Sequence, residues 1–418
     1  MAGASVKFTG DRLQRTMRPF HVHRGADNAG ARPAVPRRKR LVSAPSAIVW
    51  TEGGETRSAR WHSEGGTPAP KRVVVADDRI TADAAWRLAS EGTALLWRGD
   101  FQNARALLQA IARRIERKPR KLPHATAAPA EAFHLYRLAQ SQRARTLGML
   151  LLPFDDEYRI PLRRAPDVAE ACVEAYGPAQ GPFVASLREL LGLIGAHEWR
   201  KKGVEVPALG ARIHPHYGVF APVRGEYVGL VAAAPLPPSC ALAFDIGTGT
   251  GVLAAVLAQR GIERIVATDQ DSRALACAAE NLARLGLGGR VELMAADLFP
   301  PGRASLVVCN PPWLPGRAGS PLERAVYDPD SRMLTGFIKG LAGHLEPGGE
   351  GWLILSDLAE HLGLRSRAQL LAAIDAASLA IVGRLDARPV HPRVADAGDP
   401  LHAARAAEIT SLWRLALR

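Results

Sequence analysis

From residue 241 to the end of this 418-residue chain, short apolar segments alternate with segments of helical periodicity. The apolar segments begin with "ALAFDIG", "RIVATD", "RVELMAAD" and "SLVVCN", and helices are expected between them at 251–260 and 272–285. A helix near 331–345, the strand "GWLILS", a helix near 366–377 and two closing strands follow. This alternation predicts an α/β fold with a doubly wound, mostly parallel seven-stranded sheet, whose ligand binds at the carboxyl ends of the strands. We assign residues 205–418 to this domain.

Residues 69–204 have strand and helix signals of their own. "KRVVVADD" and "TALLW" are predicted strands, and a helix with Thr81 as its N-cap lies between them. A longer helix follows Asp100. Further helices are expected near 131–145, 167–176 and 183–196, with a hairpin over "MLLLPFDDEYRIPL". The pattern predicts a separate N-terminal α/β domain.

The first 68 residues are rich in Arg, Gly, Pro and Ala and lack sustained periodicity. We predict a basic, largely flexible arm with a short strand at "SAIVW". The chain carries a net charge of +13, and its first 40 residues hold ten Lys or Arg against only Asp11 and Asp27. Such a block attracts phosphate backbones, so RNA or a ribosomal partner is physically reasonable. A solvated leader and a transit peptide are the alternative interpretations.

Composition excludes several other classes of protein. No apolar run approaches the ~18 residues that a membrane helix needs, and no apolar stretch follows the basic N-terminus as in a signal peptide. Four cysteines stand far apart without a CxxC pair, which argues against a zinc site and a disulfide framework. His214 and His216 share one strand face but have no third ligand nearby, so no metal is expected. We predict a cytoplasmic protein that binds neither membrane nor metal.

The segment "FDIGTGTGVL" joins the first strand of the C-terminal domain to its helix. Gly247, Gly249 and Gly251 lie where backbone amides and a helix N-terminus face a ligand in a doubly wound sheet. Glycine permits unusual dihedral angles there and the close approach of a bulky group. A GxGxG pattern alone is also compatible with an ordinary turn.

Three carboxylates near successive strand ends strengthen this interpretation. Asp245 can pair with a cationic amine, Asp269 can accept hydrogen bonds from both hydroxyls of a ribose, and Asp297 is within reach of an adenine amine. Each acid alone is more often a helix cap or a solvated strand end. Together they describe a nucleoside with a cationic, amino-acid-like tail.

With these residues, the chain resembles the class I S-adenosylmethionine-dependent methyltransferases over residues 205–418, including the "LEPGG" turn. The resemblance implies a Rossmann-like fold with S-adenosylmethionine as cofactor. It places the three glycines beneath the cofactor, Asp269 at the ribose, Asp297 at the adenine and Asp245 near the methionine end. It also implies cofactor contacts from the neighbouring residues Thr248, Gln270, Leu298 and Asn310.

A second motif, "VVCNPPWLP", places Asn310, Pro311, Pro312 and Trp313 directly after an apolar strand. The prolines stiffen the loop and direct the Asn310 amide and the Pro311 carbonyl into the crevice. A planar nitrogen is a poor nucleophile because its lone pair is delocalised. Two acceptors that bind its N–H groups can aim it at a sulfonium methyl group, so that positioning replaces a strong base. Trp313 offers a flat face for stacking.

This motif resembles the [ND]PPY signature of methyltransferases that act on adenine N6 or on glutamine side chains of release factors and a ribosomal protein. Trp stands where Tyr is usual. The resemblance implies catalytic roles for the four residues from Asn310 to Trp313, and an RNA or a translation-related protein as substrate. The segment "HYGVFAPVRGEYVGLV" resembles the stretch before the first strand in the release-factor branch. The order differs, because Pro222 here precedes Arg224 and Glu226. These two charged residues can also simply cap the next helix.

Two rival functions differ in what they require of the sequence. A nicotinamide dehydrogenase requires GxGxxG, whereas the third glycine here comes too early, at Gly251. A non-catalytic RNA-binding protein with a degenerate methyltransferase fold fits the basic arm, but all the cofactor positions are intact. We therefore expect an S-adenosylmethionine-dependent N-methyltransferase in which residues 69–204 recognise the substrate. The Gly/Pro-interrupted segment 316–332 is expected to be a mobile lid over that substrate.

Overall fold

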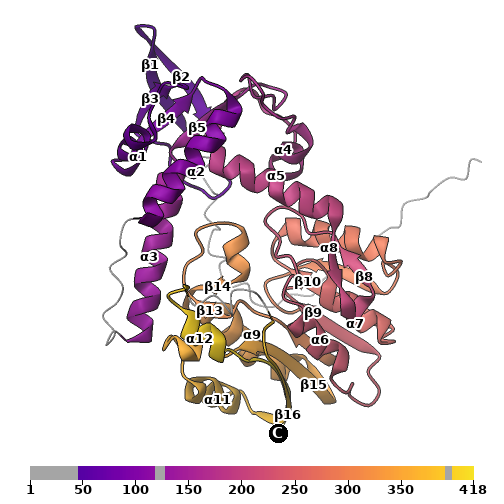
Figure 1. Ribbon diagram of the computed structural model, residues 1–418. Helices are drawn as coiled ribbons and strands as arrows, with labels where there is room; N and C mark the ends of the chain where they lie inside the picture. Colours follow the sequence, from indigo (N-terminus) through magenta and orange to yellow (C-terminus); the bar gives the residue numbers. More distant parts are fainter. Residues whose placement is uncertain (1–45, 118–127, 391–397) are drawn as a thin grey trace, which may run out of the picture. The chain divides into compact units, whose positions relative to one another are not determined.

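The computed structural model describes residues 46–117, 128–390 and 398–418, and residues 45–418 form one compact unit. Two sheets organise this unit, a six-stranded sheet from the N-terminal half and a seven-stranded sheet from the C-terminal half (Figure 1). The predicted basic arm lies outside the described residues up to residue 45.

The N-terminal sheet is mixed. Across the sheet its strands are β1 (Ala47–Glu52), β2 (Glu55–Trp61), β6 (Phe183–Ser186), β5 (Leu150–Phe154), β4 (Thr93–Trp97) and β3 (Arg72–Ala76). The pairs β3–β4, β4–β5 and β2–β6 are parallel, whereas β1–β2 and β5–β6 are antiparallel. The predicted α/β character of this half is therefore observed.

The expected boundary of the arm at residue 68 is wrong. Strands β1 and β2 form a hairpin, and Ile48, Trp50 and Trp61 bury their side chains against the N-terminal sheet. Gly53 and Gly54 form its two-residue turn, both with positive φ (62° and 81°). Two consecutive glycines between alternating residues are a recognised hairpin signal, and the expectation of an arm overlooked it.

The expected hairpin over residues 149–162 is also wrong. Strand β5 instead pairs with β6, which is distant in sequence, and with β4. After β5, the carboxylate of Asp155 accepts hydrogen bonds from the backbone N–H groups of Glu157 and Arg159, at 2.9 and 2.8 Å. Together with the bond from the Asp155 N–H to the carbonyl of Arg159 at 2.9 Å, these bonds close a tight turn after β5, and no second strand pairs back onto β5 from this fully described segment.

Five helices accompany the N-terminal sheet in the described part of the chain: α1 (Ala82–Ser90), α2 (Phe101–Arg117), α3 (Pro129–Leu147), α4 (Ala169–Tyr176) and α5 (Leu187–Lys202). The predicted N-cap of α1 is confirmed, since the Thr81 hydroxyl accepts the N–H of Ala84 at 3.2 Å. The helix expected at 183–196 begins only at Leu187. The four preceding residues, "FVAS", are all buried and form the central strand β6.

The C-terminal sheet confirms the seven-stranded prediction. Its order is β11 (Val291–Ala295), β10 (Arg264–Asp269), β9 (Leu242–Ile246), β12 (Ala304–Cys309), β15 (Leu345–Ser356), β17 (Thr410–Leu417) and β16 (Leu379–Ala387). The strands from β11 to β15 are parallel, and β17 runs antiparallel to both of its neighbours. The connections place the carboxyl ends of β9, β10, β11 and β12 at one edge.

Helices cover both faces of this sheet (Figure 1). On β9, Ala243 packs with α6 (Glu226–Ala233), α7 (Val252–Gln259) and α8 (Ser272–Arg284), whereas the next residue, Phe244, packs with α9 (Arg332–His344) and α11 (Arg367–Ala376). Successive side chains of a strand point to opposite faces, so an uninterrupted apolar strand requires two apolar layers. This explains why these strands lack polar alternation.

Short elements complete the C-terminal half. They are the hairpin β7 (Val204–Val206) and β8 (Ala211–Ile213), the pair β13 (Leu314–Pro315) and β14 (Tyr327–Asp328), the 3-10 turns η1 (Pro207–Leu209), η2 (Leu322–Ala325) and η3 (Pro329–Ser331), and the helices α10 (Leu358–His361) and α12 (His402–Ala407). The pair β13 and β14 follows directly after the motif at 310–313. Segment 316–332, the expected lid, contains η2, β14 and η3, and its mobility remains a prediction.

Phe133 is the buried aromatic anchor of helix α3 on the C-terminal half. Phe133 is 3% exposed and packs in an apolar cluster with Leu314, Leu358, Leu362 and Leu401, all from the C-terminal half. Tyr136 packs against the same cluster from the next turn of the helix. Leu138, by contrast, is 55% exposed. Phe133 is thus the most deeply buried part of the contact between α3 and the C-terminal half.

We expect Phe133→Ala to lower the free energy of unfolding by about 3 kcal/mol or more, because it removes a buried ring and leaves a cavity. Chemical denaturation followed by circular dichroism measures the change. Leu138→Ala is the matched control on the same helix and should change the free energy by less than about 0.5 kcal/mol. Equal losses in the two variants would contradict the assignment of Phe133 as the anchor.

Candidate active site at the carboxyl edge of the sheet

A cavity of about 1180 Å³ lies at the carboxyl edge of the C-terminal sheet. Eleven of the thirteen predicted site residues line it: Gly247, Thr248, Gly249, Asp269, Gln270, Asp297, Leu298, Asn310, Pro311, Pro312 and Trp313. Asp245 and Gly251 do not. Ligand pockets usually measure about 300–1,000 Å³, so this cavity has room for two reacting groups.

The glycine loop forms one wall of the cavity with backbone alone. Gly247 and Gly249 have positive φ angles of 73° and 56°. At this φ a side chain on Gly247 would be strained, and its Cβ atom would also displace the Met333 methyl carbon, which lies 2.5 Å from that position. The N–H groups of Gly247 and Thr248 both donate to the carbonyl of Thr268, at 2.9 Å, and fix the loop against β10.

Asp245 and Gly251 support this loop from behind. Asp245 is 1% exposed, and its Oδ2 accepts the Thr248 hydroxyl at 2.7 Å and the Ala254 N–H at 3.1 Å. Burial raises the pKa of this carboxyl to about 6, although the two hydrogen bonds act to lower it. Gly251 (φ 79°) precedes α7, and a Cβ there would lie 3.1 Å from that of Ala278 on α8. Both residues shape the site without reaching the cavity.

Asp269 lies where the sequence places a ribose ligand, at the end of β10 beside the glycine loop. Its two oxygens accept the N–H groups of Asp271 at 2.9 Å and Gly249 at 3.1 Å. Burial raises the pKa of Asp269, while these backbone hydrogen bonds act to lower it. A carboxylate has about four acceptor sites, so Asp269 can still accept a further donor from the cavity.

Asp297 lies at the far end of the same edge, and its side chain is 56% exposed. It forms an ion pair with Arg332, the first residue of α9. Its neighbour Leu298 has φ at 78°, an outlier for a bulky residue, and its carbonyl accepts the Thr268 hydroxyl at 2.6 Å. Strained backbone of this kind occurs often at functional sites.

The asparagine motif has an internal hydrogen bond that the sequence does not reveal. The indole N–H of Trp313 donates to Oδ1 of Asn310 at 2.9 Å, and this bond fixes the orientation of the amide. A carbonyl oxygen has two lone pairs, so one stays available. The guanidinium of Arg224 lies 5.0 Å from the centre of the Trp313 ring and is held there by a cation–π contact.

Arg224 also pairs with two buried carboxylates. Its Nε donates to Glu226 at 2.7 Å and its terminal nitrogen to Glu408 at 3.0 Å. The side chains of Glu226 and Glu408 are 5% and 2% exposed, and Glu408 also accepts the Ser356 hydroxyl. Arg224 therefore links α6 to the region before β17. This role goes beyond the helix cap that the sequence allowed.

Other residues of the site had no clear sequence signal. Tyr136, Arg137 and Gln140 line the cavity from α3, in the N-terminal half. Buried Asp328 accepts the N–H groups of Met333 and Leu334, at 2.8 and 3.2 Å, at the start of α9. An N-terminal helix could not be assigned to this cavity without the tertiary structure.

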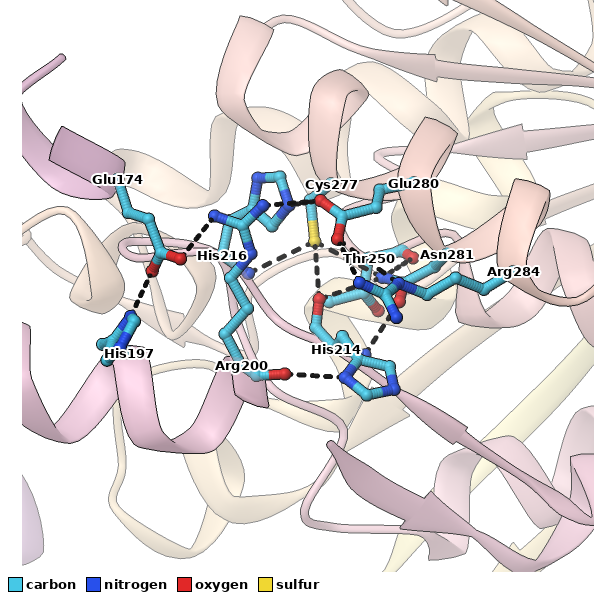
Figure 2. A network of polar contacts seen from close by, with 10 residues as sticks. All are labelled: Glu174, His197, Arg200, His214, His216, Thr250, Cys277, Glu280, Asn281 and Arg284. Atoms are coloured by element: carbon cyan, nitrogen blue, oxygen red, sulfur yellow. Dashed lines mark hydrogen bonds and ion pairs between the residues drawn. The ribbon is translucent and has the colours of Figure 1, made fainter. Parts of the chain in front are cut away.

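A polar network on α8 supports the glycine loop (Figure 2). Asn281 is 1% exposed, and its amide nitrogen donates to the carbonyl of Thr250 at 3.1 Å. Its Oδ1 accepts the N–H of His214 at 2.7 Å. A sequence signal for this role existed, because Asn281 is a polar residue on the apolar face that Ala274, Cys277 and Ala278 define.

The same network explains the two histidines. His216 Nε2 lies 2.7 Å from Glu280, and Arg200 of α5 donates to the same carboxylate oxygen at 2.6 Å (Figure 2). His214 Nδ1 lies 2.6 Å from the carbonyl oxygen of Arg200. Burial acts to raise the pKa of Glu280, but its hydrogen-bonding partners outweigh this and hold it at about 2. Both histidines thus join α5 to the C-terminal half.

Over 46–117, 128–390 and 398–418, no group of three or more His, Cys, Asp or Glu side chains is arranged to hold a metal ion. Within the same ranges, no helix has the length and apolar character needed to cross a bilayer.

Part of the C-terminal half matches a known family model. Residues 211–367 match the model described as "Methyltransferase small domain". The chain is 35% identical over 179 residues to "Release factor glutamine methyltransferase" of Cereibacter sphaeroides, covering 40% of this chain and 63% of that protein.

Two further relatives have other acceptors in their names. "Ribosomal protein L11 methyltransferase" of Sorangium cellulosum is 39% identical over 153 residues, covering 37% of this chain and 40% of that protein. "tRNA1(Val) (adenine(37)-N6)-methyltransferase" of Bacteroides fragilis is 32% identical over 149 residues, covering 32% of this chain and 63% of that protein. The chain thus spans between 40% and 63% of the length of these three relatives.

The buried carboxyl of Asp245 predicts a pH dependence of stability. Its folded pKa of about 6 lies above that of an unfolded aspartate, so between the two values the folded protein holds a proton that the unfolded chain has released. The stabilising contribution is complete below the unfolded pKa and is lost as the pH rises through about 6. From about pH 4 to pH 7, we expect the wild type to lose up to about 3 kcal/mol relative to Asp245→Asn.

Denaturant titration at several pH values measures this difference. Asp156→Asn, at an exposed aspartate, is the control and should follow the wild-type curve. Parallel pH profiles for the wild type and Asp245→Asn would show that Asp245 does not titrate in this range.

Proposed function

We propose that this protein, whose residues 211–367 match the methyltransferase small domain model, is an S-adenosylmethionine-dependent N-methyltransferase acting on a planar nitrogen. One observation carries the proposal. The glycine loop, Asp269 and the four residues from Asn310 to Trp313 line a single cavity of about 1180 Å³.

The residues around the cavity fit the cofactor. Gly247 and Gly249 bring backbone without side chains to the cavity wall, and the carboxylate of Asp269 on the same wall would accept hydrogen bonds from the ribose hydroxyls. Leu298 and Asp297 lie beyond Asp269 on the same edge, where the adenine is expected. Asp245 would hold the loop rather than the methionine portion, because it lies behind the loop. When bound, S-adenosylmethionine supplies an electrophilic methyl group on a sulfonium.

On the acceptor side, the chain supplies hydrogen-bond acceptors rather than a strong base. Asn310 Oδ1 has one lone pair beyond its bond to Trp313, and the carbonyl of Pro311 is a second acceptor on a stiff loop. Two acceptors at fixed positions would orient an NH₂ group and stabilise the positive charge that develops on nitrogen. No group within this motif has to remove a proton before transfer.

Two chemical groups meet these requirements, the carboxamide of glutamine and the N6 amine of adenine. Both carry an NH₂ group on a conjugated plane. The names of the relatives include a release factor glutamine, a ribosomal protein and a tRNA adenine. We therefore propose a component of the translation apparatus, RNA or protein, as the cytoplasmic acceptor.

Substitutions should separate the two ends of the cavity. We expect Asn310→Ala to reduce methyl transfer by about 100-fold or more, because an acceptor aimed at the reacting nitrogen is lost. Its affinity for S-adenosylmethionine, measured by calorimetry, should change by less than about twofold. Asp269→Ala should weaken cofactor binding by about tenfold or more, because hydrogen bonds to a charged group are lost.

Asn103→Ala is the control, since Asn103 lies on α2 and bonds to Asp78 outside the cavity. It should leave both measurements at their wild-type values. A similar loss of cofactor binding in Asn310→Ala and Asp269→Ala would contradict the division of roles. Absence of cofactor binding by the wild type would favour a non-catalytic protein.

The indole N–H of Trp313 can be tested separately. Trp313→Phe keeps an aromatic ring but removes the hydrogen bond to Asn310, so we expect kcat to fall about tenfold while cofactor affinity is retained. Trp199→Phe, at a half-exposed tryptophan of α5, is the control. A wild-type rate for Trp313→Phe would mean that the orientation of Asn310 does not depend on this bond.

The acceptor class can be identified by transfer of tritiated methyl groups. S-adenosylmethionine labelled in the methyl group is incubated with the protein and a lysate from cells that lack it. Digestion with ribonuclease or with protease then releases the label from an RNA or a protein acceptor, respectively.

A further inference from the structure

Helix α3 gives the cavity a wall from outside the methyltransferase small domain. It spans Pro129–Leu147, whereas the family match begins at residue 211. Tyr136, Arg137 and Gln140 line the same cavity as Asn310 and Trp313. A feature outside the family segment that reaches the site can distinguish this protein from its relatives.

Among these three residues, Arg137 makes the most extensive contacts with the C-terminal half. One terminal nitrogen pairs with Glu323 at 3.2 Å, and the other donates to the carbonyl of Arg317 at 2.7 Å. The centre of its guanidinium lies 3.8 Å from the centre of the Tyr327 ring. Arg137 thus contacts residues 317, 323 and 327 at once, with a side chain that is 24% exposed.

The planar guanidinium suits all three contacts. A flat cation can stack on an aromatic face while its N–H groups donate in its own plane. A lysine ammonium could pair with Glu323, but it has no planar face and fewer donors. The contact therefore requires arginine in particular, and not only a positive charge.

The segment that Arg137 holds is connected to both ends of the reaction site. It begins at Leu314, directly after Trp313, and its short strands are joined by a bond from the Leu314 N–H to the carbonyl of Val326 at 3.1 Å. It ends at Asp328, which accepts the N–H of Met333. The Met333 methyl group in turn lies against Gly247.

We propose that Arg137 is a positioning residue of the acceptor site. It holds residues 314–328 against α3, so that this segment and α3 enclose the acceptor beside Asn310. This inference rests on the proposed function, and it makes α3 the element through which the N-terminal half contributes to acceptor binding. Tyr136 and Gln140, which flank Arg137 on the cavity wall, contribute to the acceptor contact surface.

Hydrogen exchange tests the contact without any acceptor. We expect backbone amides of residues 314–328 to exchange about tenfold faster or more in Arg137→Ala, because local opening becomes easier when the contact is lost. In Arg137→Lys, the same backbone amides should be only partly protected from exchange. Arg143→Ala is the matched control, since Arg143 lies on the same helix and pairs at 2.8 Å with Glu116 of α2 rather than with this segment. Mass spectrometry of peptides from this region measures the rates.

Methyl transfer then separates positioning from a purely structural role. The probes are total RNA and a ribosomal and release-factor protein fraction, both from cells that lack this protein. For the fraction that the wild type labels, we expect kcat/KM to fall about tenfold or more in Arg137→Ala and to recover partly in Arg137→Lys. The dissociation constant for S-adenosylhomocysteine should stay within about twofold of the wild type, and Arg143→Ala should match the wild type throughout.

The outcomes distinguish this inference from the function on which it rests. Unchanged exchange in Arg137→Ala would overturn the inference alone, and so would faster exchange with unchanged transfer, because Arg137 would then be only a structural contact. A wild type that labels neither fraction would overturn the proposed function, and the positioning role with it. Faster exchange together with weaker transfer and intact cofactor affinity would support both.

Discussion

The buried carboxylate of Asp245 is the constraint on which the site depends. One of its oxygens joins strand β9, the Thr248 hydroxyl of the glycine loop and the first turn of α7. The loop can then follow a path of positive φ angles and present only backbone to the cavity. Burial raises the pKa of this carboxyl because the charged form is costly there, and its two hydrogen bonds fix the turn that forms the cavity wall.

Two walls of different origin meet at this cavity. The glycine loop and the Asn310 motif come from the strand ends of the C-terminal sheet, whereas Tyr136, Arg137 and Gln140 come from α3. Phe133 and Tyr136 attach α3 by apolar packing, and Arg137 adds directional contacts from the same helix. The planar guanidinium of Arg137 makes these contacts specific in geometry.

The acceptor side differs from the usual motif at one residue, and the structure indicates a physical consequence. Trp313 donates its ring N–H to the amide of Asn310, which a tyrosine ring cannot do from the same atom. Arg224 rests on the tryptophan ring and is itself neutralised by Glu226 and Glu408. The orientation of Asn310 thus depends on a chain of contacts that runs from α6 to β17.

The sequence by itself determined the C-terminal fold, because apolar strands and their spacing leave little choice but a parallel sheet covered by helices. It also brought Asp269, the glycines and Asn310 to one edge, since the carboxyl ends of parallel strands coincide. From the sequence, Asp245 is predicted to lie at the ligand, whereas in the structure it lies behind the glycine loop. Local sequence does not show on which side of a loop a carboxylate lies. Only the tertiary structure decided that α3 walls the cavity and that Arg137 holds the segment after Trp313. These contacts join residues that are about 180 positions apart, and no local pattern encodes such pairing.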